Sequence, residues 1–171
     1  VFVFTPAGEV ISMRNGATPL DFAYAIHSEV GHHCKGAWVN GVMVPFDTVL
    51  KNGDNVEIIT AADQRPNKNW LQIAKTSRAR NRIKAFLRVE QREQSLKVGK
   101  GLLERALRKK GISFSRVMKS GELDKLASRF GFSSGNDVVA AIGYGRLDES
   151  AVVFELLPEE SKQESRSTIR E

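Results

Sequence analysis

Three histidines and one cysteine, His27, His32, His33 and Cys34, are the residues of this sequence best suited to metal or nucleophilic chemistry. Imidazole and thiolate groups are common ligands of zinc. Adjacent positions in a turn rarely converge on one ion, however, and no second cysteine or acidic set completes a coordination shell. We therefore expect no metal site and no cofactor. A lone cysteine also cannot form an internal disulfide, which favours a cytoplasmic setting.

Sequence motifs for phosphate binding and hydrolysis are absent. Gly99-Lys100-Gly101 lacks the upstream glycine and the hydroxyl residue of a phosphate-binding loop. Gly143-Tyr144-Gly145 lacks the third glycine of a dinucleotide site, and we interpret it as a helix terminator. The Gly-x-Ser-x-Gly pattern at residues 131–135 follows a predicted helix and not a strand, so it is not a nucleophile elbow, and no His-Asp dipeptide occurs. We therefore expect no catalytic residues in this chain.

Positive charge is concentrated in the middle of the sequence. The whole chain has a net charge of +6. Residues 1–63 contain 3 basic and 7 acidic residues, whereas residues 65–110 contain 15 basic and 3 acidic residues. A central segment of net +12 is typical of a protein that contacts phosphates, although a solvated helix face would also have many charges.

The elements that position these residues begin with a predicted hairpin. Residues 1–4 and 9–13 are rich in β-branched and aromatic side chains, and a Pro and a Gly lie in the turn between them. The run Thr18-Pro19-Leu20-Asp21 combines an N-cap, a proline at the first helical position and an acid three residues after the cap. It predicts the start of one helix over residues 19–30.

Three further strands are predicted, and Asn40-Gly41 predicts a type I′ hairpin between the first two. They cover residues 37–39, 42–44 and 56–60. The order of strands and helix indicates an α+β fold class, with a β-grasp (ubiquitin-like) domain over residues 1–62.

From Trp70 onward, apolar residues recur at intervals of three and four, which predicts helices. We expect a linker over residues 63–69 and a basic, all-α helical domain over residues 70–157. Its later helices are predicted at residues 122–130, 137–142 and 149–157. The polar tail over residues 158–171 is predicted to be disordered.

Several runs of the sequence resemble one known family. They are Val1 to Val10, Gly16 to His27, Gly31-His32, Gly36-Ala37, Asn40-Gly41, Val44-Pro45, Asn52 to Thr60, Asn69-Trp70-Leu71 and Lys75 to Lys84. Together they resemble the TGS domain and the following helical domain of the long Rel/SpoT proteins. TGS domains also occur in threonyl-tRNA synthetases and certain GTPases, but Thr76-Ser77-Arg78-Ala79-Arg80 at this distance favours Rel/SpoT.

The resemblance implies a parent enzyme of the stringent response, a GTP pyrophosphokinase that makes (p)ppGpp and in many relatives also hydrolyses it as a 3′-diphosphatase. It implies that this chain is a regulatory segment that senses the CCA end of deacylated tRNA on the ribosome. The controlled hydrolase and synthetase domains would lie upstream in the same chain.

The resemblance also implies roles for particular residues. His27 would stack on the CCA bases, with Tyr24 and Lys35 beside it. The residues expected to contact the RNA backbone are Arg78, Arg80, Arg82, Lys84 and Arg88. On the residues alone, the favoured interpretation of His27 is a half-exposed residue near a helix end, packed on Tyr24.

Two other functions stay open. β-grasp domains often bind proteins through a sheet edge or face, and in some SpoT-type relatives the TGS domain engages acyl carrier protein. An enzyme within the chain is the third possibility, which incubation with ATP and GTP would test. No stretch is long and apolar enough for a membrane span, so we expect no membrane partner.

Overall fold

Short antiparallel strands form the sheets of the first part of the chain in a computed structural model that describes residues 1–169. The strands are β1 (Phe2–Phe4), β2 (Val10–Ser12), β3 (Cys34–Val39), β4 (Val42–Val44) and β5 (Val56–Thr60). β1 pairs with β2, β3 pairs with both β4 and β5, and a parallel bridge between Phe4 and Asn55 connects the two sheets. Asn40 and Gly41 have φ angles of 53° and 80°, as a type I′ turn requires. The predicted strands and hairpin are confirmed, and β3 begins three residues earlier than expected.

Two helices cover residues 19–32, where one was predicted. α1 (Pro19–Ile26) begins with the predicted cap: Thr18 and Asp21 exchange side-chain and backbone hydrogen bonds. The helix ends at His27, whose backbone is extended, with φ −165° and ψ 148°. α2 (Ser28–His32) starts immediately afterwards, because the His27 imidazole caps it. The prediction of a single helix over residues 19–30 is therefore wrong.

α1 and α2 pack closely through a glycine. A Cβ built on Gly31 would overlap the ring of Tyr24, so no larger residue fits at this position without a shift of the ring. This close crossing between two short helices was not predicted.

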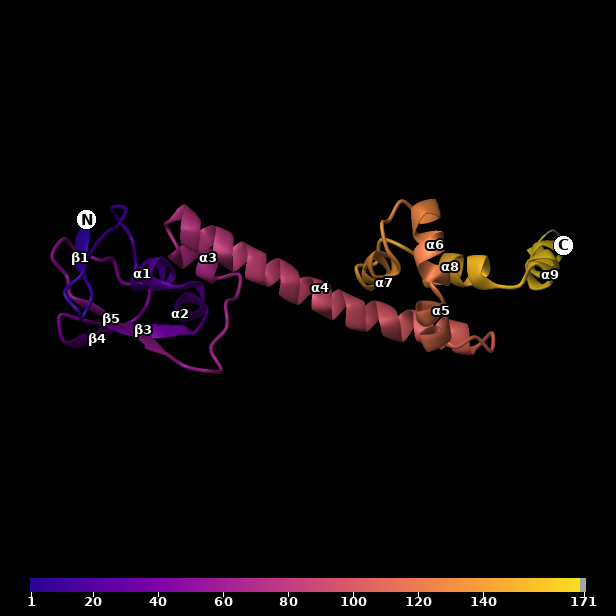
Figure 1. Cartoon of the computed structure of the whole chain (residues 1–171), viewed down its shortest axis with the longest axis horizontal. Helices are drawn as coiled ribbons and strands as arrows, with labels where there is room; N and C mark the ends of the chain where they lie inside the picture. Colours follow the sequence, from indigo (N-terminus) through magenta and orange to yellow (C-terminus); the bar gives the residue numbers. More distant parts are fainter. Residues whose placement is uncertain (170–171) are drawn as a thin grey trace. The chain divides into compact units, whose positions relative to one another are not determined.

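α3 (Trp70–Ile73) and the first turns of α4 (Ser77–Arg108) complete the core of this part of the chain (Figure 1). One apolar cluster consists of Leu20, Ala23, Tyr24, Cys34, Trp70, Ala74, Ala79 and Ile83. Because these helical residues bury their side chains against α1, the chain divides inside α4, into a first unit, Val1–Val89, and a second unit, Glu90–Glu171. This division differs from the predicted boundaries at residues 62 and 70.

Short helices pack against the C-terminal part of α4 in the second unit. They are α5 (Phe114–Ser120), α6 (Glu122–Ala127), the 3-10 helix η1 (Ser128–Phe130), α7 (Gly135–Gly143) and α8 (Glu149–Leu156). Leu103 and Leu107 of α4 are buried with Val138 and Ile142 of α7 in its core. The predicted helices are confirmed with shifted ends, whereas α5 was not predicted.

Two glycines let α4 and α7 touch backbone to backbone. A Cβ built on Gly99 would overlap the carbonyl of Val139, and a Cβ built on Gly143 would overlap the backbone of Ser95. Both glycines are therefore required by the packing of the second unit. Gly145, with φ 76°, follows the end of α7, as expected for a helix terminator.

The C-terminal tail was predicted to be disordered, but the structure forms helix α9 (Glu159–Ile169) there. Pro158 precedes two acids, Glu159 and Glu160, which suit the positive end of a helix dipole, and Lys162 pairs with Glu159 at 3.3 Å. Residues 170 and 171 lie outside the described residues. Over residues 1–169, no helix is both long and apolar enough to cross a membrane.

Candidate nucleic-acid interface

His27 lies exposed at the junction between α1 and α2. Its Nδ1 atom accepts a hydrogen bond from the backbone N–H of Glu29 at 3.1 Å. This bond requires an unprotonated Nδ1, so the neutral ring has its proton on Nε2. The cap fixes the ring orientation while leaving the imidazole on the surface. A fixed, exposed aromatic ring is a suitable platform for an unpaired base.

Tyr24, which we expected beside His27 on the RNA-binding surface, is fully buried, with 0% relative exposure. Its hydroxyl lies 2.9 Å from Nδ1 of His32, and burial raises the pKa of the phenol well above its ordinary value, with a smaller contribution from Cys34. Tyr24 shares the helical stripe of Leu20 and Ala23, so its spacing already placed it on the buried face. We therefore correct this expectation: Tyr24 is a core residue.

His32 connects this core to α4. Its ring packs edge-on against Tyr24, with centroids 5.3 Å apart, and lies 4.9 Å from the ring of Phe86. Burial lowers the pKa of His32, and the charge of Arg82 lowers it further, while Glu29 opposes the shift. His32 is thus kept neutral within a contact between α2 and α4 that sequence analysis did not predict.

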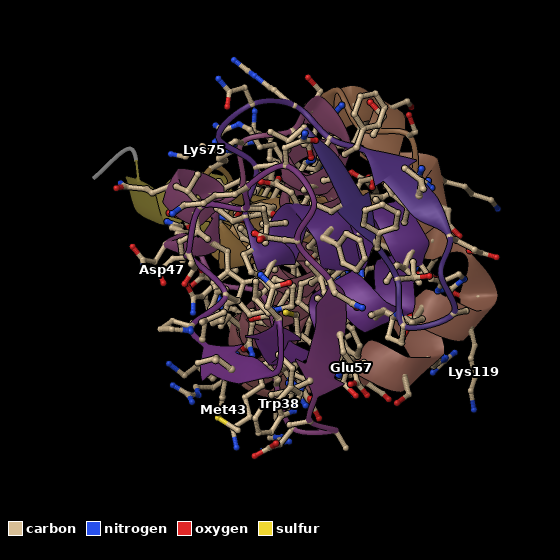
Figure 2. The ribbon with its side chains drawn as sticks, turned by 90° about the vertical axis from the view of Figure 1, so that its left-hand side faces the viewer. Trp38, Met43, Asp47, Glu57, Lys75 and Lys119 are labelled. Carbon is tan, nitrogen blue, oxygen red and sulfur yellow. The ribbon has the colours of Figure 1, made fainter. Side chains whose placement is uncertain are left out.

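Lys35 is exposed at the beginning of β3, beside an apolar strip on the outer face of the sheet. Trp38 lies opposite Met43 on β4 and Glu57 on β5 (Figure 2). Trp38 and Met43 are 40% and 60% exposed. A cavity of about 390 Å³ includes Met43 in its lining, with Lys35, Gly36, Val44, Pro45 and Ile59. The alternation of strand side chains, with Ala37 buried, could have indicated that Trp38 faces solvent.

Four of the five basic residues predicted to contact RNA are exposed on α4: Arg78, Arg82, Lys84 and Arg88. Within the part of the chain whose side chains are described, none of these four has a carboxylate partner within 4.0 Å. Arg78 and Arg82 are four residues apart and share one helix face. These cations are available to phosphates.

Arg80 differs from its neighbours because its guanidinium is used inside the first unit. Its Nη1 atom donates hydrogen bonds to the carbonyl oxygens of Leu71 and Ala74, at the end of α3. These carbonyls lack partners within their own helix, and a cation suits the negative end of the helix dipole. Arg80 therefore has a structural role in the first unit, and its contact with the RNA backbone stays a prediction.

Asp21 connects α1 to the segment between α3 and α4. The carboxylate, 1% exposed, accepts hydrogen bonds from the backbone N–H groups of Lys75 and Thr76 and from the Thr76 hydroxyl, at 2.9 to 3.1 Å. Thr18 donates to the same carboxylate. The sequence predicted Asp21 only as a helix-start residue, since its partners 54 and 55 positions away leave no local pattern.

No cluster of three His, Cys, Asp or Glu side chains arranged to hold a metal ion occurs in the described residues. The first unit instead combines an exposed ring, an exposed lysine and a row of cations that have no carboxylate partner among the described side chains. Groups of these kinds are suited to contact bases and phosphates.

Comparison with known proteins identifies two domains. A profile of the TGS domain matches residues 1–60, and a profile of the RelA/SpoT AH domain matches residues 86–157. Together with the β-grasp sheet and the following helices, these matches define a TGS domain joined to a RelA/SpoT AH domain. The chain belongs to the Rel/SpoT family.

Curated relatives agree with this assignment over most of the chain. A GTP pyrophosphokinase of Myxococcus xanthus is 49% identical over 94% of this chain and 21% of its own length. A bifunctional (p)ppGpp synthase/hydrolase RelA of Mycobacterium tuberculosis is 38% identical over 93% of this chain and 22% of its own length. A guanosine-3′,5′-bis(diphosphate) 3′-pyrophosphohydrolase of Aquifex aeolicus is 41% identical over 98% of this chain and 24% of its own length. The chain thus spans about a fifth to a quarter of these relatives.

Proposed function

We propose that this chain is the regulatory segment of a cytoplasmic (p)ppGpp synthetase/hydrolase and senses the CCA end of deacylated tRNA on the ribosome. The names of two relatives, GTP pyrophosphokinase and (p)ppGpp synthase/hydrolase, support this activity for the parent protein. In this proposal the chain itself performs no catalysis. It controls the hydrolase and synthetase domains of the parent protein.

The observation that supports tRNA sensing most strongly is the fixed, exposed ring of His27. A base at an unpaired RNA end stacks on such a ring with a free energy of about 1–3 kcal/mol. An amino acid esterified to that end adds bulk and a positive charge at the same place. A close-fitting site would then favour the uncharged tRNA.

Phosphate affinity in this proposal comes from the cations of α4. The segment before α3 has more acidic than basic residues, so its net charge is negative. Lys35 by itself therefore gives the sheet little electrostatic attraction for RNA. Arg78, Arg82, Lys84 and Arg88 are exposed and would release counterions from the backbone on binding. Binding should therefore weaken steeply as salt increases.

Two substitutions of His27 separate stacking from capping. His27→Asn keeps a side-chain oxygen that can cap α2 but removes the ring, whereas His27→Phe keeps a ring but removes the cap. Stacking predicts that, in the full-length parent on ribosomes, Phe retains part of the synthesis stimulated by deacylated tRNA and Asn loses most of it. The opposite order would show that His27 acts only through the fold.

A second function is favoured by the exposed apolar strip of Trp38 and Met43, which has the composition of a protein-binding surface. The partner that the family resemblance suggests is acyl carrier protein. Trp38→Ser would reduce capture of that protein and leave RNA binding unchanged. Capture from a lysate with and without ribonuclease distinguishes the two functions.

A further inference from the structure

Trp38 and Glu57 are neighbours on the outer face of the sheet. They lie opposite each other on β3 and β5, so their side chains leave the sheet on the same side (Figure 2). Trp38 is 40% exposed, and Glu57 is exposed as well. A cavity of about 430 Å³ lies beside them, and the rest of its lining is Pro6, Asn40, Gly41 and Asn55. An indole ring and a carboxylate therefore border one open cavity.

Neither of these two groups has a positive partner in the part of the chain that the structure describes. The Glu57 carboxylate has no lysine, arginine or histidine nitrogen within 4.0 Å among the described side chains, and no basic residue lines the cavity. The cations that lie over aromatic rings in the described residues contact Phe114 and Tyr144, not Trp38. An indole face and a carboxylate both attract a cation, and here both are left without one.

The turn at Asn40 fixes one wall of the cavity. The Asn40 side chain donates a hydrogen bond to Oδ1 of Asp54 and accepts one from the backbone N–H of Asn55, both at 2.9 Å. Asp54 adds a second negative charge behind this wall, and it too has no ion pair among the described side chains. Residues 1–63 have 3 basic and 7 acidic residues, a net charge of −4. The cavity is thus preformed, and its surroundings favour a cation.

The charges around the cavity decide which ligand it suits. Glu57 and Asp54 would repel the phosphates of RNA and the carboxylates of an acidic protein. Among cations, the planar guanidinium of arginine can stack on an indole ring while its N–H groups bond a carboxylate beside the ring. The compact ammonium of lysine cannot combine these two contacts in one plane. An arginine side chain is therefore the ligand that fits Trp38 and Glu57 best.

A second cavity on the same face is mostly apolar. It is the cavity of about 390 Å³ that includes Gly36, Met43 and Ile59 in its lining. Gly36 and Asn40, which line different cavities, lie two residues before and after Trp38, so the two cavities are about 13 Å apart along the strand direction. An extended polypeptide covers this distance in four residues. One short segment can therefore place a side chain in each cavity.

We propose that the outer face of this sheet binds a basic protein segment by holding an arginine side chain between Trp38 and Glu57. An apolar side chain of the same segment, four residues away, fills the second cavity. The inference rests on the second function proposed above, protein binding through the strip of Trp38 and Met43, and names the chemistry of the partner. It needs neither RNA nor His27.

The test uses the whole chain, labelled with nitrogen-15, and three short peptides. The first peptide has a leucine and an arginine separated by three serines. In the second, citrulline replaces arginine, which keeps the shape and removes the charge, and in the third, glutamate replaces arginine. The indole N–H signal of Trp38 and the amide signal of Gly41 report binding, because the other tryptophan, Trp70, is 2% exposed. The arginine peptide should bind at least about five-fold more tightly than the citrulline peptide, by a margin that decreases as salt increases.

Two variants separate the roles of the carboxylate and the ring. Glu57→Gln should remove the preference for arginine over citrulline and leave the melting temperature unchanged, because Glu57 is exposed and has no ion pair among the described side chains. Asp47→Asn is the matched control, since it makes the same change in charge at an exposed residue outside the cavity lining (Figure 2), and it should keep the preference. Trp38→Leu should weaken binding of the arginine peptide more than binding of the citrulline peptide, as measured at Gly41.

Three results would overturn the proposal. The first is equal affinity for the arginine and citrulline peptides, or no saturable shift with the arginine peptide, which would exclude an arginine site. The second is an unchanged preference in Glu57→Gln, which would remove the role of the carboxylate. The third is tighter binding of the glutamate peptide, which would identify an acidic partner. Capture of acyl carrier protein that depends on Trp38 and not on Glu57 would leave the protein-binding function standing, so the two failures are distinguishable.

Discussion

The Oδ1 atom of Asp21 lies 2.9 Å from the backbone nitrogen of Thr76 and 3.0 Å from its hydroxyl oxygen. These bonds fasten the start of α4 to the start of α1. Asp21→Asn replaces acceptor capacity with an NH₂ group that faces other donors, and we expect a loss of about 2–4 kcal/mol in the free energy of unfolding. Urea titration would measure it. The exposed Asp63→Asn, with the same change in charge, serves as the control, and an equal effect of both variants would refute the role of these bonds.

Acid should destabilise the first unit through His32. Burial lowers the pKa of this imidazole below its ordinary value of 6.5, so the unfolded chain binds the proton more readily than the folded one. The contribution of His32 is complete above about pH 6.5 and is lost as the pH falls through the lowered pKa. His32→Gln should therefore flatten the decline in melting temperature between pH 7.5 and 5. An unchanged pH profile would mean that other groups cause the decline.

Neighbouring arginines of α4 should respond differently to the same substitution. Arg80→Met removes the hydrogen bonds to Leu71 and Ala74 and should lower the free energy of unfolding by about 1–3 kcal/mol. Arg82→Met removes an exposed cation and should change stability by less than about 0.5 kcal/mol while weakening RNA binding. Melting curves and binding titrations of both variants would check this. If Arg80→Met weakened RNA binding as much as Arg82→Met does and left stability unchanged, Arg80 would be an RNA-binding residue and not a structural one.

Glycine-to-alanine changes in the second unit should have opposite effects at two sites. Gly143→Ala places a Cβ against the Ser95 backbone and should destabilise by roughly 1–3 kcal/mol. Gly101→Ala meets no atom and should stabilise α4 by up to about 1 kcal/mol. Thermal unfolding measures both. Stabilisation by Gly143→Ala would mean that α4 and α7 separate without cost.

Local patterns predicted much of the fold. The Thr18 and Asp21 cap and the Asn40-Gly41 turn depend on neighbouring residues, and both appear as expected. The break at His27 could not be predicted, because histidine is an uncommon N-cap and the apolar spacing continues across it. α5 follows a Ser113 cap and is only seven residues long, too short for a clear apolar period.

The candidate site was less predictable than the fold. Exposure of His27, Lys35 and Arg78 agrees with an RNA-binding surface, yet Tyr24 and Arg80 belong to the structure of the first unit. Spacing could have revealed both: Tyr24 follows Leu20 by four residues, and Arg80 precedes Ile83 by three. The resemblance to a family suggested which segments to consider for RNA contact, but burial decides which of their side chains are exposed.

The burial of Trp70 and Ile83 in one cluster with Leu20 and Ala23 of α1 limits where this protein can be cut for domain recombination, in evolution or in engineering. A TGS domain excised at residue 62 would leave Leu20 and Ala23 facing water and would leave the Asp21 carboxylate without its donors from Lys75 and Thr76. The compact unit that contains this domain ends within α4, at Val89. Any recombination that grafts this domain onto a new partner must transfer the first three turns of that helix as well.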